Sequence, residues 1–137
     1  MPEDVWHRTT HRLRFSDNDS VGHVNNAVYA VMFEAGRTEL MDAAGVFVRG
    51  GALAAVIVRL EIDFKREMSW PGDVTVESAV ARFGTKSVHI NQRVWFKDTL
   101  AAEGVSILTL IDRETRRAVV LDDTLRTHFA PWTLAVP

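Results

Sequence analysis

The sequence predicts an α+β fold in which a five-stranded antiparallel sheet wraps around one long helix. Three observations support this prediction. Apolar residues recur at every second position in five segments, as in strands with one face in water. One segment, 25–44, shows the helical period instead. This segment follows the first predicted strand, and short turns join the other four strands, which favours antiparallel pairing.

Length and composition limit the possible functions. The 137 residues predict a single domain spanning 1–137, and 47% apolar with 25% charged residues is typical of a globular protein. A net charge of -2 argues against nucleic acid as the main partner. No apolar run is long enough to span a membrane, and residues 1–4 are unlike a secretory signal. The absence of cysteine excludes disulfides and a cysteine nucleophile, and fits a cytoplasmic location, although it also fits export.

The first strand and the helix are joined by a polar turn. Alternation over 5–15 predicts the strand, and the polar cluster at 16–24 predicts the turn. Asn25 or Asn26 is expected to cap the helix, and Gly45 to end it. The buried stripe of the helix is expected to consist of apolar or small residues at helical spacing: Tyr29, Met32, Phe33, Gly36, Leu40 and Ala43.

The remaining four strands follow a loop of small residues around Gly50 and Gly51. We predict them at 56–65, 74–83, 87–97 and 100–112, with a turn at 71–73 after the first of them. The stretch 105–111 is almost entirely apolar, so we expect it to be central and covered on both faces. A short helical turn is expected near 122–129. Because apolar residues remain for the outer face of the sheet, we expect at least a homodimer, and a dimer of dimers is also open.

The most informative segment is 17–26, which reads Asp-Asn-Asp-Ser-Val-Gly-His-Val-Asn-Asn. Its start matches an EF-hand calcium loop, but Val21 and Val28 stand where calcium requires oxygen ligands. His7 and His11 do not form a metal site either, since four residues along a strand separate them by about 13 Å. Two interpretations remain: polar residues that only cap the helix and shape the turn, or a hydrolytic site.

A hydrolytic site at this segment has a clear chemical basis. The unpaired N–H groups at a helix N-terminus stabilise the oxyanion that forms when a carbonyl is attacked. Asp19 lies a few residues upstream, where a carboxylate can attack the carbonyl or activate a water molecule. Gly22 permits close approach of a substrate to the backbone. Asp17 is expected to shape the turn, and Glu34 with Arg37 to form an ion pair on the helix surface.

Three blocks of the sequence carry a family resemblance. The first is D-x-D-x-x-G-H-V-N-N-x-x-Y within 14–29, followed by F-E-x-x-R at 33–37; the others lie at 64–74 and 109–115. In this order the blocks resemble the 4-hydroxybenzoyl-CoA thioesterase-like family of hotdog-fold thioesterases, which includes long-chain acyl-CoA thioesterases. The resemblance covers nearly the whole chain and implies the hotdog fold, a five-stranded antiparallel sheet around one helix.

The resemblance also implies roles for individual residues. Asp19 matches the catalytic carboxylate of the family, which acts as a nucleophile or as a general base. The backbone N–H of Asn26 matches the donor to the thioester oxygen. His23 and Asn25 match residues that shape the acyl pocket or orient the carboxylate, and Tyr29 lines the cleft. No metal and no cofactor is implied.

In this family the loop between the third and fourth strands contacts the phosphates of CoA. The corresponding residues here are Lys86 and Ser87, with Arg82 as a further basic candidate. The expected activity is hydrolysis of an acyl-CoA thioester to the free acid and CoA, with an apolar acyl group. Two alternatives stay open: an acyl carrier protein thioesterase of the same fold, and a non-catalytic protein that binds acyl ligands or a partner. Hydration of acyl-CoA uses a histidine–aspartate arrangement that the sequence lacks.

Overall fold

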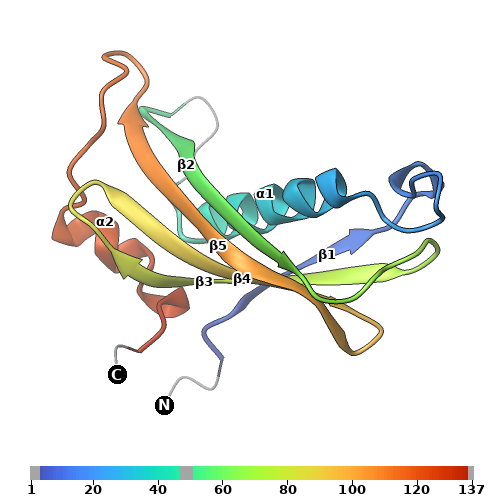
Figure 1. Ribbon diagram of the computed structural model, residues 1–137. Helices are drawn as coiled ribbons and strands as arrows, with labels where there is room; N and C mark the ends of the chain where they lie inside the picture. Colours follow the sequence, from blue (N-terminus) through green and yellow to red (C-terminus); the bar gives the residue numbers. More distant parts are fainter. Residues whose placement is uncertain (1–3, 47–50, 136–137) are drawn as a thin grey trace.

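Five antiparallel strands and one long helix form most of the structure, a computed structural model that describes residues 4–46 and 51–135 (Figure 1). The strands are β1 (His7–Arg12), β2 (Leu53–Phe64), β3 (Asp73–Phe83), β4 (Ser87–Phe96) and β5 (Thr99–Asp112). The long helix is α1 (Asn26–Ala43), and α2 (Asp123–His128) is a short helix near the C-terminus. The 3₁₀ turns are η1 (Phe15–Asp17) and η2 (Ala130–Trp132). The predicted elements are therefore confirmed, with shifts at their ends; Gly50 lies outside the described residues.

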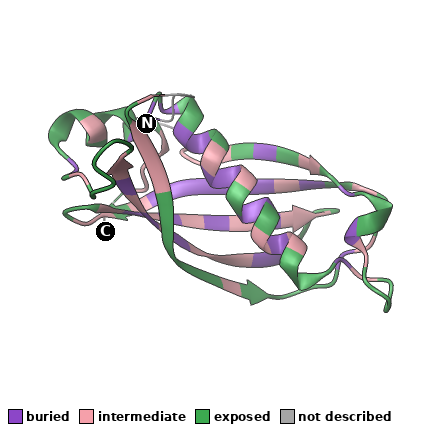
Figure 2. Cartoon of the chain, turned by 90° about the horizontal axis from the view of Figure 1, so that it is seen from above, coloured by how far each residue is buried: buried purple, intermediate pink, exposed green. Residues whose placement is uncertain are grey.

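The sheet has the order β1-β3-β4-β5-β2, so β4 is central and β1 and β2 form the edges. All four strand pairs are antiparallel. The helix α1 lies across one face of the sheet (Figure 2). Strand β5 is flanked by β4 and β2, and in its second half every second residue, Ser106, Leu108 and Leu110, is buried while the residues between them are half-buried. The expectation that this strand is covered on both faces is therefore not met within one chain, because no second layer of the described residues covers the outer face.

Both ends of α1 follow the predicted capping signals. The Asn25 side chain accepts a hydrogen bond from the Ala27 N–H at 2.9 Å. At the other end, Gly45 has a φ of 74°, and its N–H donates to the Asp42 carbonyl at 3.0 Å. The predicted buried stripe is confirmed except for Ala43, which is exposed.

The helix is fixed on the sheet by close packing around a buried polar side chain. Gly36 allows this approach, since a Cβ there would lie only 2.7 Å from a methyl group of Val76. Beside it, the buried Gln92 amide donates to the Phe33 carbonyl at 2.8 Å and to the Ser78 hydroxyl at 2.9 Å. These bonds satisfy polar groups that would be costly to bury unpaired, so the helix has one preferred position on the sheet.

Strand β2 differs from the other strands because much of it is exposed. It pairs only with β5, and its register shifts between Ile57 and Arg59. The exposed large apolar side chains of this edge strand are Val56, Ile57, Val58, Leu60 and Phe64. An unpaired, apolar strand edge is a site where another chain can add. Within residues 4–46 and 51–135, no helix is both long and apolar enough to cross a membrane.

Candidate active site

The site is built on the loop between η1 and α1. The loop closes on itself through an antiparallel bridge between Asn18 and Val24 and a hydrogen bond from the Asp19 N–H to the His23 carbonyl at 2.8 Å. Gly22 has a φ of 93°, a conformation that glycine adopts without strain. The Ser69 hydroxyl donates to the Gly22 carbonyl at 2.8 Å and ties the loop to the connection between β2 and β3. The loop is therefore held in place from two sides.

Asp19 presents an available carboxylate oxygen. Its Oδ1 accepts hydrogen bonds from the backbone N–H groups of Val21 at 2.9 Å and His23 at 3.3 Å, which orient the side chain. In the described part of the chain, no hydrogen bond reaches its Oδ2. Asp19 is exposed in the single chain and lies on the wall of a pocket. Its geometry suits a carboxylate that reacts with a bound molecule.

The first turn of α1 contributes Asn26 to the wall of the same pocket. The N–H of Ala27 is taken by the Asn25 side chain, and that of Val28 by the Asn25 carbonyl at 2.9 Å. Among the described residues, nothing accepts a hydrogen bond from the Asn26 N–H, and Asn26 lines the pocket. This N–H also lies at the positive end of the helix dipole. Asn25 is occupied as the cap and is not among the lining residues.

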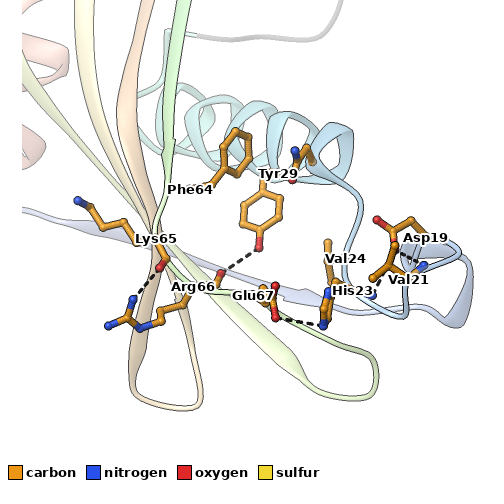
Figure 3. A pocket seen from close by; sticks show the side chains of 10 residues that line it. Asp19, Val21, His23, Val24, Tyr29, Phe64, Lys65, Arg66 and Glu67 are labelled. Atoms are coloured by element: carbon orange, nitrogen blue, oxygen red, sulfur yellow. Dashed lines mark hydrogen bonds and ion pairs between the residues drawn. The ribbon is translucent and has the colours of Figure 1, made fainter.

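The pocket has a volume of about 300 Å³. Its lining residues come from the Asp19 loop, the start of α1 and the end of β2 (Figure 3): Asp19, Val21, His23, Val24, Asn26, Tyr29, Phe64, Lys65, Arg66 and Glu67. The Tyr29 hydroxyl donates to the Arg66 carbonyl at 3.3 Å, and its ring meets Phe64 edge to face at 5.0 Å. Burial, and then the charge of Glu67, raise the pKa of Tyr29, so its hydroxyl remains a donor.

His23 is paired with a residue that the sequence analysis did not identify. Its Nε2 lies 3.1 Å from a carboxylate oxygen of Glu67, and its ring is directed toward that residue (Figure 3). Glu67 follows Lys65 and Arg66, which belong to one of the blocks that carry the family resemblance. The block was visible in the sequence, but nothing in it indicated that these residues line the same pocket as Asp19.

Asp17 has a structural environment that differs from that of Asp19. Its side chain is only 1% exposed, and its two oxygens accept hydrogen bonds from the Arg14 N–H at 2.8 Å and the Arg14 guanidinium at 3.0 Å. Burial alone raises the pKa of Asp17, but these hydrogen bonds outweigh it, so the pKa lies below the ordinary value. Its carbonyl also accepts from the Asn25 N–H at 2.9 Å. Asp17 therefore shapes the turn, as expected.

The candidate nucleotide-binding residues do not join this pocket within one chain. Arg82, Lys86 and Ser87 belong to the hairpin between β3 and β4, which lies beside α2 at the opposite end of the sheet from the Asp19 loop (Figure 1). Arg82 and Ser87 lie 3.5 Å and 3.4 Å from Nε2 of His89. Burial, and then the charge of Arg82, lower the pKa of His89.

Two further expectations concern charged residues outside the pocket. His7 and His11 lie on a strand, as expected, and the described residues contain no group of three or more potential ligands placed to hold a metal ion. Glu34 and Arg37 form the predicted ion pair, at 3.9 Å, but only Glu34 is on the surface, since the Arg37 side chain is 8% exposed. The expected surface position of Arg37 was wrong because its guanidinium also donates to the buried Ser106 hydroxyl at 3.4 Å. Burial lowers the pKa of Arg37.

A five-stranded antiparallel sheet packed against one long helix defines a hotdog-like domain. The model of the thioesterase-like superfamily matches residues 13–129, and the chain belongs to this family. None of the curated proteins matches the sequence.

Solved structures support the same fold. A "predicted thioesterase" from Bacillus stearothermophilus has 28% identity and a TM-score of 0.84, covering 96% of this chain and 99% of that one. A DHNA-CoA thioesterase from Staphylococcus aureus has 20% identity and a TM-score of 0.80, covering 93% and 88%. Another Staphylococcus aureus protein, solved in complex with CoA, has 18% identity and a TM-score of 0.81, covering 96% and 89%.

Proposed function

We propose that the protein hydrolyses an acyl-CoA thioester to the free acid and CoA. The observation that carries the proposal is one pocket lined by both Asp19, with a carboxylate oxygen that no hydrogen bond reaches, and Asn26, whose N–H has no acceptor among the described residues. Membership of the thioesterase-like superfamily supports it, as do the names of the DHNA-CoA thioesterase and of the relative solved with CoA. Apolar groups on the pocket wall, such as Tyr29 and Phe64, suit an apolar acyl group.

The reaction uses the two groups in complementary roles. The Asn26 N–H donates to the thioester oxygen and stabilises the negative charge that develops there. Asp19 either attacks the carbonyl carbon, forming an anhydride that water then hydrolyses, or takes a proton from the water that attacks it. In both routes the C–S bond breaks and the CoA thiolate leaves and is protonated. Gly22 gives the substrate access to the backbone. Asn25 caps the start of the helix, and His23 forms part of the pocket wall.

In this proposal a second copy of the chain covers the apolar strand edge beside the site. The exposed apolar edge of β2 continues to Phe64, which lines the Asp19 pocket. Pairing along this edge covers apolar surface and forms a homodimer, which can associate further into a dimer of dimers. Light scattering is expected to show a dimer for the wild-type protein and monomers for Leu60→Lys. A monomeric wild-type protein contradicts this arrangement.

A thiol-release assay over a panel of acyl-CoA substrates tests the proposed activity. The panel contains short, long and aromatic acyl groups, and each acid product is identified by mass spectrometry. We expect turnover of at least one member. Turnover only of thioesters on an acyl carrier protein supports the carrier-protein alternative, and binding of acyl-CoA without turnover supports a non-catalytic binding protein. Either of these two results contradicts the proposal.

A further inference from the structure

We propose that Arg66 and Lys97 bind the phosphate groups of the CoA moiety, in the same chain as the Asp19 that acts on the thioester. This inference rests on the proposed function and assigns its nucleotide end to residues that the family resemblance does not indicate. The ligand chemistry is that of a phosphorylated pantetheine arm ending in a nucleotide.

A second hollow adjoins the Asp19 pocket. It has a volume of about 450 Å³ and is lined by Arg66, Glu67, Phe96, Lys97, Thr99 and Ala101. Arg66 and Glu67 line both hollows. The Arg66 carbonyl faces Tyr29, whereas its guanidinium extends away from Asp19 (Figure 3). A ligand with its thioester at Asp19 can therefore extend past Arg66 into the second hollow.

Arg66 and Lys97 are the cations of this region that have no acidic partner among the described residues. The Arg66 guanidinium donates to the Lys65 carbonyl at 2.9 Å, and the Lys97 ammonium lies 4.9 Å from the centre of the Phe96 ring. By contrast, Lys65 pairs with Glu103 at 3.3 Å, and Glu67 is engaged by His23. The planar fork of arginine and the point charge of lysine are both suited to phosphate oxygens.

Backbone interactions fix the two segments that carry these cations. The N–H groups of Lys65 and Arg66 donate to the Ala101 carbonyl at 2.8 Å and 3.1 Å, which joins the end of β2 to the start of β5. Lys97 and Asp98 have φ values of 50° and 62° and form the tight turn between β4 and β5. Less conformational entropy is lost on binding when a site is fixed in this way.

The position of this hollow explains how one chain could supply both ends of the substrate site. Lys86, the cation indicated by the family resemblance, lies on the hairpin at the opposite end of the sheet (Figure 1). The two assignments differ in a measurable way, because one depends on Arg66 and Lys97 and the other on Lys86.

Steady-state kinetics with paired substrates test the inference. Arg66→Ala and Lys97→Ala are compared with Lys86→Ala and with Arg117→Ala, an exposed arginine on the loop after β5 that serves as the matched control. Each variant is assayed with an acyl-CoA and with the acyl-pantetheine that carries the same acyl group but no phosphate. We expect KM for acyl-CoA to rise about tenfold in each of the first two variants, as for loss of a charge-assisted hydrogen bond. With acyl-pantetheine, KM and kcat of these two variants stay within about twofold of the wild-type values. Arg117→Ala keeps the wild-type KM and kcat with both substrates.

Binding of CoA itself, measured by calorimetry, separates this inference from the proposed activity. We expect Kd to rise about tenfold in Arg66→Ala and in Lys97→Ala, and to rise with salt in the wild-type protein. If the wild-type protein binds CoA in this pattern but hydrolyses no thioester, the proposed function fails and the binding site stands. The inference is overturned if Arg66→Ala and Lys97→Ala change the kinetics with acyl-CoA and acyl-pantetheine equally. It is also overturned if only Lys86→Ala has an effect specific to the CoA substrate, or if the wild-type protein does not bind CoA.

Discussion

Replacing Asp17 by asparagine is expected to destabilise the fold. The carboxylate is buried and accepts two hydrogen bonds from Arg14, one from its backbone N–H and one from the guanidinium of a side chain that is 71% exposed. The substituted amide can accept only one of these bonds, and it places an N–H₂ group toward the other donor. Hydrogen bonds to a charged group contribute about 1.5–3 kcal/mol, and solvent partly screens the bond from the exposed guanidinium. We therefore expect the free energy of unfolding to fall by about 2.5 kcal/mol. For a chain of this length, the loss corresponds to a fall in Tm of about 8 °C.

Urea unfolding followed by circular dichroism measures this loss, with Asp19→Asn as the matched control. Asp19 is exposed, and its asparagine variant keeps an oxygen for the N–H groups of Val21 and His23, so we expect a change below about 0.5 kcal/mol. Equal stability of the two variants would refute the structural role of Asp17.

The pH dependence of the same comparison follows from the lowered pKa of Asp17. A carboxyl group with a lower pKa in the folded state stabilises the protein above its unfolded value, near 3.8, and this stabilisation is lost as pH falls through the folded value. The difference in the free energy of unfolding between wild type and Asp17→Asn is therefore expected to have its full size at pH 6 and to shrink below about pH 4. A difference that stays constant down to pH 3 contradicts the assignment.

Two further predictions concern the packing of the sheet. In Gly104→Ala, the new Cβ would lie 1.9 Å from the Glu61 carbonyl oxygen. We therefore expect β2 to shift on β5 and the free energy of unfolding to fall by about 3 kcal/mol. An unchanged Tm in thermal unfolding contradicts this prediction. Gln92→Leu removes the bonds that its amide donates to the Phe33 carbonyl and the Ser78 hydroxyl and the bond that it accepts from the Ser106 hydroxyl. These three partners stay buried, which is expected to cost about 2–3 kcal/mol in urea unfolding. A variant as stable as wild type would show that this polar cluster does not fix the helix.

Features fixed by neighbouring residues could be predicted from the sequence. Asn25 and Gly45 mark the ends of α1 because capping depends on groups only a few residues away. Asp19 and Asn26 face one pocket because the short loop between them closes on itself. Such local signals predicted the order of the elements and a carboxylate a few residues before the helix N-terminus, whereas the choice of the Asn26 N–H was implied by the family resemblance.

Features that depend on distant contacts could not be predicted. Glu67 reaches His23 only because the connection after β2 returns to the loop, where the Val24 N–H donates to the Met68 carbonyl at 2.7 Å. Arg37 was expected on the surface, because its burial depends on Ser106 in a distant strand. No period or motif of the sequence encodes these encounters, since each depends on how the sheet curves around the helix.

The central claim is that Asp19 performs the chemistry, and the kinetics of Asp19→Asn test it most directly. With the best acyl-CoA of the panel, we expect kcat to fall about a hundredfold or more while KM stays within about threefold, because asparagine keeps the shape of the side chain but cannot act as a nucleophile or base. Full activity in a folded Asp19→Asn protein would contradict the account.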